Sequence, residues 1–404
     1  MAVIVIADST AHYDGRSLAD RALGATESSV IHLARELARR RHDITVLTNC
    51  TAPLDWEGTH WRQLKDGHSE PCDLYVAVQH PDLLGLVPRA ARRALWVLWQ
   101  PEHLDGYKRI LRMWRFRPVP ILTSHYQARS YQPDPWSHEG RQLLGLGPSA
   151  TSPTQFPPPT VPARPWLGGT RRIAKAWAAR MLLPSPAPLI VIPLGLPEDA
   201  RGNAPLAATP GPRAIFASNP VRNLRRLVEI WAASILPKVP GAVLDVYGIH
   251  EMRSGDGWRD WEGSLLPPNM PAAVKASVSI HPTAPRAVLI EAMRTARVIL
   301  YLGHECEAFC MVLAEAQALG TPAVVAPIAA LPERVIDGVT GYHRSDPDGF
   351  AKAAIALLTD DALWRRQHEA ALRLQQGIDW AEIAGRFESA LLGDLLPSIG
   401  SAPR

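Results

Sequence analysis

The sequence lacks the features that mark membrane-spanning and secreted proteins. No apolar run approaches the ~18 residues that a helix needs to cross a membrane, and Met1–Asp8 has no basic segment of the kind that opens a signal peptide. Only four cysteines occur in 404 residues, which excludes a disulfide scaffold and fits a reducing compartment. The formal net charge of +4 is too small to indicate a nucleic-acid-binding protein. We therefore expect a cytoplasmic protein, with peripheral contact at the inner membrane face left open.

Proline, in contrast, is over-represented. The chain has 38 prolines, roughly twice the ~5% average, and hydrophobic residues make up 47% of its length. At ~150 residues per domain, the length allows two or three domains. Because proline is excluded from helix interiors and central strands, we interpret residues 147–188 as a proline-rich insertion. The prolines that indicate it are Pro148, Pro153, Pro157, Pro158, Pro159, Pro162 and Pro165.

Short apolar runs alternate with helical patterns along the chain, which predicts an α/β fold with parallel sheets. A helix opens after Gly24, and a 16-residue loop from Asp8 to Leu23 precedes it. The expected strands are Val3–Ala7, Asp43–Thr48, Asp73–Val78, Arg93–Leu98, Pro120–Ser124, Pro188–Pro193, Ala214–Ala217, Ala242–Gly248, Val298–Leu302 and Ala323–Ala326. The other expected helices are Leu224–Ala233, Arg286–Arg294, Phe309–Leu319, Pro347–Leu358, Ala362–Gln376 and Trp380–Leu392.

The alternation occurs twice, which predicts two Rossmann-like domains facing each other across a cleft. We expect an N-terminal domain over residues 1–190, which includes the insertion, and a C-terminal domain over 191–379. Residues 380–404 form a terminal helix that we expect to pack back on the N-terminal domain. Ligands of such sheets bind beyond the carboxyl ends of the strands.

Two carboxylates, Glu307 and Glu315, lie eight residues apart where a predicted helix begins. A fully helical spacing of eight residues rises about 12 Å, which exceeds the ~5–9.5 Å of a hydrolase acid–base pair. We therefore interpret them as two anchors on one elongated ligand. A carboxylate accepts hydrogen bonds from both hydroxyls of a diol, and a nucleotide sugar offers such diols at its ribose and its hexose. The helix N-terminus would face a diphosphate.

This region resembles the retaining GT-B glycosyltransferases of family four. Glu307 to Glu315 resembles the E-x7-E motif of that family. The motifs that follow in order and spacing are Gly320-Thr-Pro, Leu331-Pro-Glu333 and Asp337-Gly-Val-Thr-Gly341. The resemblance extends to Ser218-Asn-Pro-Val-Arg222-Asn-Leu224, Val246-Tyr-Gly248, Gly24-Ala-Thr-Glu27, Leu37–Val46 and Val191-Ile-Pro-Leu-Gly195. It covers nearly the whole chain except the proline-rich segment.

The resemblance implies that residues 1–190 form an acceptor domain and that residues 191–379 form a nucleotide-sugar donor domain, which carries most of the donor site. Glu307 would contact the donor sugar and Glu315 the ribose, while Arg222 takes the place of a phosphate-binding lysine. Gly24 would let the first helix approach the diphosphate, and His103 lies near the position of a catalytic histidine. The remaining residues expected to contact the donor are Ser218, Ala308, Phe309, Cys310 and Leu313. We expect no metal, because no Asp/His set has the spacing of ligands.

Some residues depart from the family pattern. The family's second phosphate cation, an arginine, falls on Ala217, where Arg225 or Arg226 would have to compensate, and a glycine pair is replaced by Ala329-Ala330. The resemblance implies transfer of a sugar, with retention, from a nucleoside diphosphate sugar to a glycan, lipid-linked or small-molecule acceptor. Because of these departures, a catalytically silent homologue that binds nucleotide sugar or glycan without transfer is a second alternative. A nucleotide-sugar epimerase is the third.

A basic, aromatic segment lies at Lys108–Arg117. It has five cations with Trp114 and Phe116, which suits an anionic lipid surface or a charged, lipid-linked acceptor. The alternative interpretation is a solvated helix with a buried edge formed by Ile110, Leu111 and Trp114.

Overall fold

The computed structural model describes residues 1–21, 23–100, 104, 107–131, 189–248, 265–266, 270–281 and 284–393. The expected insertion at residues 147–188 and the candidate His103 lie outside the described residues. The described chain divides into two compact units. Unit 1 takes residues up to 131, residues 189–195 and residues 378–393, and unit 2 takes the described residues between 196 and 377. The predicted α/β class, with two units built on parallel sheets, is confirmed.

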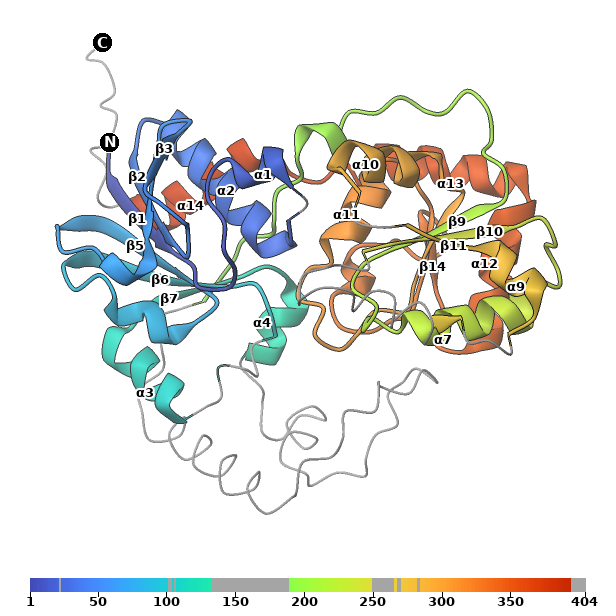
Figure 1. Ribbon diagram of the computed structural model, residues 1–404, viewed down its shortest axis with the longest axis horizontal. Helices are drawn as coiled ribbons and strands as arrows, with labels where there is room; N and C mark the ends of the chain where they lie inside the picture. The colour runs from blue at the N-terminus through green and yellow to red at the C-terminus, as the bar shows by residue number, and fades with distance from the viewer. Residues whose placement is uncertain are drawn as a thin grey trace, which may run out of the picture. The chain divides into compact units, whose positions relative to one another are not determined.

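Unit 1 is built on an eight-stranded sheet of order β3-β4-β2-β1-β5-β6-β7-β8 (Figure 1). All neighbours pair in parallel except β3 and β4. The strands are β1 (Val3–Ala7), β2 (Asp43–Thr48), β3 (Leu54–Trp56), β4 (Thr59–Gln63), β5 (Cys72–Val78), β6 (Ala90–Val97), β7 (Val119–Leu122) and β8 (Ile190–Val191). The central strands are buried on both faces, which explains their continuous apolar runs.

The helices of unit 1 include one segment from the far end of the chain. They are α1 (Ser17–Asp20), α2 (Ala25–Arg39), α3 (Tyr107–Phe116), α4 (His125–Tyr131) and α14 (Trp380–Leu392), with 3₁₀ turns at Leu64–Asp66 and Pro81–Gly85. α14 lies against α2, so the chain returns to unit 1 after completing unit 2 (Figure 1). Trp380 stacks on His32 with ring centroids 5.6 Å apart, and Gly195 leaves room for its indole.

Two expectations for unit 1 are wrong in detail. The segment from Asp8 to Leu23 contains the short helix α1 instead of being a plain loop. In α3, Met113 is buried while 44% of the Trp114 surface is exposed, so Trp114 is not part of a buried edge. The amphipathic pattern allowed either side chain to face the core, and only packing decides between them.

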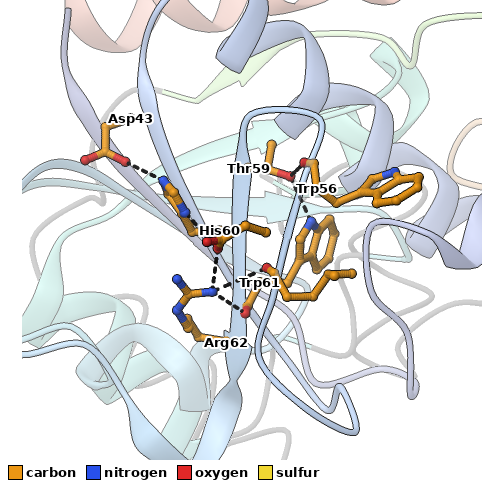
Figure 2. Close-up of polar contacts among 8 residues, drawn as sticks. Asp43, Trp56, Thr59, His60, Trp61 and Arg62 are labelled. Atoms are coloured by element: carbon orange, nitrogen blue, oxygen red, sulfur yellow. Dashed lines mark hydrogen bonds and ion pairs between the residues drawn. The ribbon is translucent and has the colours of Figure 1, made fainter.

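The sequence pattern missed the hairpin of β3 and β4. Its turn places Glu57 and Gly58 at φ 47° and 77°, the left-handed conformation that a two-residue hairpin turn requires. Figure 2 shows the polar contacts along it: the Trp61 indole donates to Thr59 Oγ1 at 2.8 Å, and that hydroxyl donates to the carbonyl of Trp56 at 2.6 Å. These bonds satisfy the polar atoms of a buried aromatic residue at the sheet edge.

Unit 2 has a six-stranded parallel sheet of order β11-β10-β9-β12-β13-β14. The strands are β9 (Arg213–Ala217), β10 (Val243–Tyr247), β11 (Val278–Ile280), β12 (Val298–Tyr301), β13 (Ala323–Val325) and β14 (Gly341–His343). Renumbered within the unit, this is the 3-2-1-4-5-6 order of a doubly wound dinucleotide-binding sheet. The order reverses between β9 and β12, and such a switch point is where these sheets bind ligands.

Helices cover the sheet of unit 2. They are α7 (Leu224–Ile230), α9 (Ala272–Ser277), α10 (Arg286–Thr295), α11 (Met311–Ala318), α12 (Pro347–Thr359) and α13 (Asp361–Leu374). A π-helical turn at Trp231–Ile235 continues α7, and 3₁₀ turns occur at Glu198–Ala200 (η5) and Leu331–Glu333. The expected start of α11 at Phe309 is wrong: the helix begins at Met311, because Cys310 has φ 66° and ψ 72° and cannot continue it.

Candidate functional site

The candidate site of unit 2 begins where β9, β10 and β12 end. Ser218 follows β9, Gly248 follows β10 and Tyr301 ends β12. Gly248 has φ 94°, and a Cβ there would lie 2.6 Å from the carbonyl oxygen of Ser218, so glycine is required at this crossing of the two strand ends. The three strand ends therefore converge at the switch point of the sheet.

Glu307 is a buried carboxylate at this point. The hydroxyl of Tyr301 donates to Glu307 Oε1 at 2.6 Å, and Ser218 Oγ lies 3.1 Å from the same hydroxyl. Since the Tyr301 proton is used by Glu307, Ser218 donates in turn to the Tyr301 oxygen. Burial raises the pKa of Glu307, while Arg222 and the Tyr301 hydrogen bond oppose the rise. The site therefore holds a carboxylate whose charge depends on its two neighbours.

Arg222 provides the positive charge beside Glu307. Its Nε lies 3.4 Å from Glu307 Oε1, and its Nη1 donates to the Sγ of Cys306. Burial lowers the pKa of Arg222, but Glu307, Tyr301 and Cys306 together raise it by more, so the guanidinium is firmly protonated. The structure thus brings together Arg222 and Glu307, two of the residues that the sequence resemblance assigned to the donor site.

Asn223 fixes the turn that carries Arg222. It has φ 65° directly before α7, and its Nδ2 donates to the carbonyl of Gly303 at 2.7 Å. Asparagine tolerates the left-handed conformation better than most residues. The turn after β9 is thus tied to the loop after β12, which brings Arg222 toward Glu307.

The residues between Glu307 and α11 form a tight, buried turn. Ala308, Phe309 and Cys310 are all buried, and the guanidinium of Arg334 lies 4.3 Å from the Phe309 ring centroid. Leu313, in the first turn of α11, is completely buried. The first N–H groups of a helix have no partner within the helix, so the start of α11 suits a negatively charged group.

Glu315 lies further along α11 and has a separate partner. Its Oε1 lies 2.8 Å from Nη2 of Arg286, the first residue of α10. Arg286 also pairs with Asp199 in η5. Burial raises the pKa of Glu315, and Arg286 opposes the rise. The expected pair of carboxylates is therefore present as two buried groups, each with its own arginine.

Sequence reasoning missed Tyr301, Arg334, Arg286 and Asp199. In the sequence pattern, Tyr301 is indistinguishable from the other apolar residues of its strand, and Arg286 from any other cation on a helix. Asp199 and Arg286 are 87 residues apart, so no local pattern could connect them. Arg226, which was considered as a second phosphate cation, pairs with Glu229 on its own helix at 2.8 Å.

Gly24, the expected contact in unit 1, is the residue before α2. A Cβ on Gly24 would lie 2.5 Å from Glu27 Oε2, so the carboxylate of Glu27 folds back on the first turn of α2. A negative charge is favourable at this end of a helix, although burial raises the pKa of Glu27. The helix N-terminus that was expected to face a diphosphate is thus next to a carboxylate of its own.

The site of unit 2 combines a protonated guanidinium, a helix start and two acceptor carboxylates. Guanidinium and free N–H groups bind phosphate oxygens, and carboxylates bind sugar hydroxyls. In the part of the chain that the structure describes, no group of three or more His, Cys, Asp or Glu side chains could hold a metal ion. Within the same residues, no helix is both long and apolar enough to span a bilayer.

Comparison with known proteins finds a family match in the C-terminal part of the chain. Residues 271–373 match the family model described as glycosyl transferases group 1. This range contains Arg286, Glu307 and Glu315, whereas Ser218 and Arg222 precede it. The chain is 33% identical over 131 residues to D-inositol 3-phosphate glycosyltransferase of Thermobifida fusca (strain YX), covering 32% of this chain and 30% of that protein.

A second relative also matches only part of the chain. D-inositol 3-phosphate glycosyltransferase of Mycolicibacterium gilvum (strain PYR-GCK) is 30% identical over 157 residues, which covers 38% of this chain and 34% of that protein. The chain thus matches these curated relatives over about a third of their length.

Solved structures match over nearly the whole chain. Sucrose-phosphate synthase from Thermosynechococcus elongatus has a TM-score of 0.65 at 15% identity, with 97% of this chain and 99% of that chain covered. Anabaena HepE in complex with UDP-glucose has a TM-score of 0.64 at 13% identity, with 97% and 100% covered. At these identities the likeness establishes the fold, which is the predicted GT-B architecture.

Proposed function

We propose that this protein is a retaining glycosyltransferase that moves a sugar from a nucleoside diphosphate sugar to a glycan, a lipid-linked or a small-molecule acceptor. The observation that carries the proposal is the pair of the half-buried Arg222 and the buried Glu307 at the switch point of the unit 2 sheet. The match of residues 271–373 to glycosyl transferases group 1 supports it. HepE in complex with UDP-glucose, a protein of the same fold, supports a nucleotide-sugar donor.

Arg222 and the start of α11 would hold the diphosphate. Arg222 already lies against Glu307, so a bound diphosphate would share the guanidinium with that carboxylate. A guanidinium offers five donors, which allows it to serve both groups. We propose that this charge neutralises the leaving diphosphate without a metal ion.

Glu307 would accept hydrogen bonds from the donor sugar, and Glu315 from the ribose hydroxyls. The Tyr301 hydroxyl keeps Glu307 aimed at one position, and Ser218 in turn holds Tyr301. A carboxylate held in this way is an acceptor that needs little reorganisation when the sugar binds.

Retention would follow if the acceptor attacks on the face from which the diphosphate leaves. The bond between the anomeric carbon and the phosphate oxygen breaks, and the acceptor oxygen forms a bond to that carbon on the same face. The acceptor proton passes to the departing phosphate oxygen, so no protein base is required. Arg222 would stabilise the negative charge that develops on the diphosphate.

A catalytically silent homologue is the second candidate. It is favoured by Ala217, which stands where the family's second phosphate cation is expected and is a buried strand-end residue. Such a protein would bind a nucleotide sugar without transferring it. Isomerisation of the donor without an acceptor would instead indicate an epimerase.

A panel of UDP-, GDP- and ADP-sugars distinguishes these candidates. The full chain is incubated with each donor, and release of nucleoside diphosphate and the anomeric configuration of any product are measured. Glu307→Gln should abolish most turnover, while Glu305→Gln, at an exposed position two residues earlier, should not. Binding without turnover would select the silent homologue. An inverted product would reject retention, and unchanged turnover in Glu307→Gln would reject the placement of the donor sugar.

We also propose a cytoplasmic location with peripheral membrane contact through α3. Trp114 on this helix is 44% exposed, and Lys108, Arg115 and Arg117 are exposed near it. An exposed indole among cations suits the interface of an anionic bilayer. Co-sedimentation with vesicles should therefore increase with their content of anionic lipid and decrease in Trp114→Ser. Equal sedimentation with neutral and anionic vesicles would reject this contact.

A further inference from the structure

Arg286 occupies an unfavourable position in α10. It is the first residue of that helix, after Pro285. The N-terminus of a helix carries partial positive charge, so a cation there is disfavoured and an anion is favoured. A residue that breaks a local preference of this kind is expected at a site where another interaction requires it.

The requirement comes from two carboxylates on two other elements. Nε and Nη2 of Arg286 donate to the two carboxylate oxygens of Asp199, at 2.7 and 2.8 Å. Nη2 also lies 2.8 Å from Oε1 of Glu315. Nη2 therefore contacts both carboxylates, through a hydrogen bond to Asp199 and an ion pair with Glu315. The Asp199 fork fixes the plane of the guanidinium, and it thereby fixes the position of the positive charge beside Glu315.

The element that carries Asp199 is itself anchored. Asp199 lies in η5 (Glu198–Ala200), whose last residue, Ala200, is completely buried in the core of unit 2. η5 packs against both α10 and α11. Asp199 therefore holds Arg286 from a fixed point, although 45% of its own side chain is exposed.

Glu315 depends on this arrangement for its charge. Its side chain is only 7% exposed, and burial raises its pKa, whereas the charge and hydrogen bond of Arg286 lower it. A protonated or rotated carboxyl group would accept fewer hydrogen bonds than the ionised group. An ionised carboxylate in one orientation can receive a pair of neighbouring hydroxyls.

We infer that Arg286, held by Asp199, is the positioning residue of Glu315, and that it gives the site its preference for ribonucleotides over 2′-deoxyribonucleotides. The inference rests on the proposed function, in which Glu315 receives the ribose hydroxyls. It adds that the preference requires Arg286 and Asp199, neither of which touches the sugar. Arg286 acts through Glu315 by keeping that carboxylate ionised and aimed.

The test is calorimetric titration of the full-length protein with UDP, GDP and ADP, and with the 2′-deoxy form of each one that binds. Wild type should bind the ribo form about tenfold or more tightly than the deoxy form, as expected for one lost hydrogen bond to a charged group. Glu315→Gln and Arg286→Gln should reduce this ratio to about one to three, and Asp199→Asn to an intermediate value. The preference of wild type should disappear at low pH, and Arg286→Gln should move that loss to higher pH.

Arg294→Gln is the matched control. Arg294 belongs to the same helix, its side chain is 33% exposed as is that of Arg286, and it makes a two-bond pair with Glu291. Its substitution should leave the ratio unchanged. A general loss of structure would weaken ribo and deoxy ligands alike, whereas loss of positioning lowers the ratio.

The outcomes separate this inference from the proposed function. If wild type binds none of the nucleoside diphosphates, the proposed function fails and the inference fails with it. If Glu315→Gln removes the preference while Arg286→Gln and Asp199→Asn keep it, the proposed function stands and the inference is overturned. If wild type binds a diphosphate with no preference for ribose, the inference is overturned as well.

Discussion

Tyr301→Phe tests how the site controls the charge of Glu307. The change removes the hydroxyl that donates to Glu307 Oε1 at 2.6 Å and keeps the ring, which stacks on Phe216 with centroids 5.8 Å apart. The hydrogen bond favours the ionised carboxylate, so its loss should raise the pKa of Glu307 further above the ordinary value. Donor turnover should then require a higher pH.

The size of the shift follows from the geometry. Both groups are buried, and a hydrogen bond to a charged group contributes about 1.5–3 kcal/mol. Since 1.36 kcal/mol corresponds to one pKa unit, the pKa of Glu307 should rise by about one to two units. Arg222 remains beside the carboxylate and limits the rise. The sign is fixed, because removing a donor to the ionised form can only favour the protonated form.

The assay is the pH dependence of kcat/KM for release of nucleoside diphosphate. Because burial raises the pKa of Glu307, the acidic limb should lie above the usual range of a glutamate carboxyl in wild type and move to still higher pH in Tyr301→Phe. Tyr75→Phe is the matched control, since Tyr75 is equally buried, donates to the carbonyl of Leu83 at 2.7 Å and belongs to unit 1. An acidic limb that stays in place in Tyr301→Phe, or that moves equally in the control, would refute the reasoning.

Three further substitutions test the packing within unit 2 and the packing of α14 on α2 in unit 1. Cys310→Val should destabilise unit 2 by about 2 kcal/mol in urea unfolding, because a β-branched residue is strained at φ 66°, and Cys72→Val, in a strand, should cost less. An equal cost at both positions would reject the strain argument. Arg297→Met should cost about 2–3 kcal/mol, because this buried arginine donates to the carbonyls of Leu357 and Pro210 and to Asp361, and a change below about 0.5 kcal/mol would contradict that role. Trp380→Ala should destabilise unit 1 by about 3–5 kcal/mol and increase hydrogen exchange in α2, and unchanged exchange there would contradict the packing of α14 on α2.

Elements with a strong local signal could be predicted from the sequence. The bounds of β1, β2 and α14 agree with the expected ones, because Val3–Ala7 and Asp43–Thr48 are compact apolar runs and Asp379 caps α14 by accepting from the Glu382 N–H. The β3–β4 hairpin was missed because most of its residues are polar. The pair Glu57-Gly58 between two aromatic segments was its one local sign.

Only those residues of the candidate site that belong to a local sequence motif could be selected from the sequence. Glu307 and Glu315 could be found by their spacing, and Arg222 by its place in a motif. The partners of these residues depend on tertiary structure. Tyr301, at the end of β12, contacts Glu307 because the loop after β12 folds back over that strand end. Arg286 contacts Glu315 because α10 and α11 are neighbours. Contacts of this kind carry no periodicity, so sequence reasoning had no means to select these residues.

The central claim is that Arg222 and Glu307 contact different parts of one ligand, and donor binding tests it most directly. The full-length protein and its Arg222→Gln and Glu307→Gln variants are titrated with a nucleoside diphosphate and with the corresponding nucleoside diphosphate sugar. Arg222→Gln should weaken both ligands about tenfold or more, whereas Glu307→Gln should weaken only the sugar-bearing ligand. Equal effects of Glu307→Gln on the two ligands, or no effect of either variant, would contradict the account.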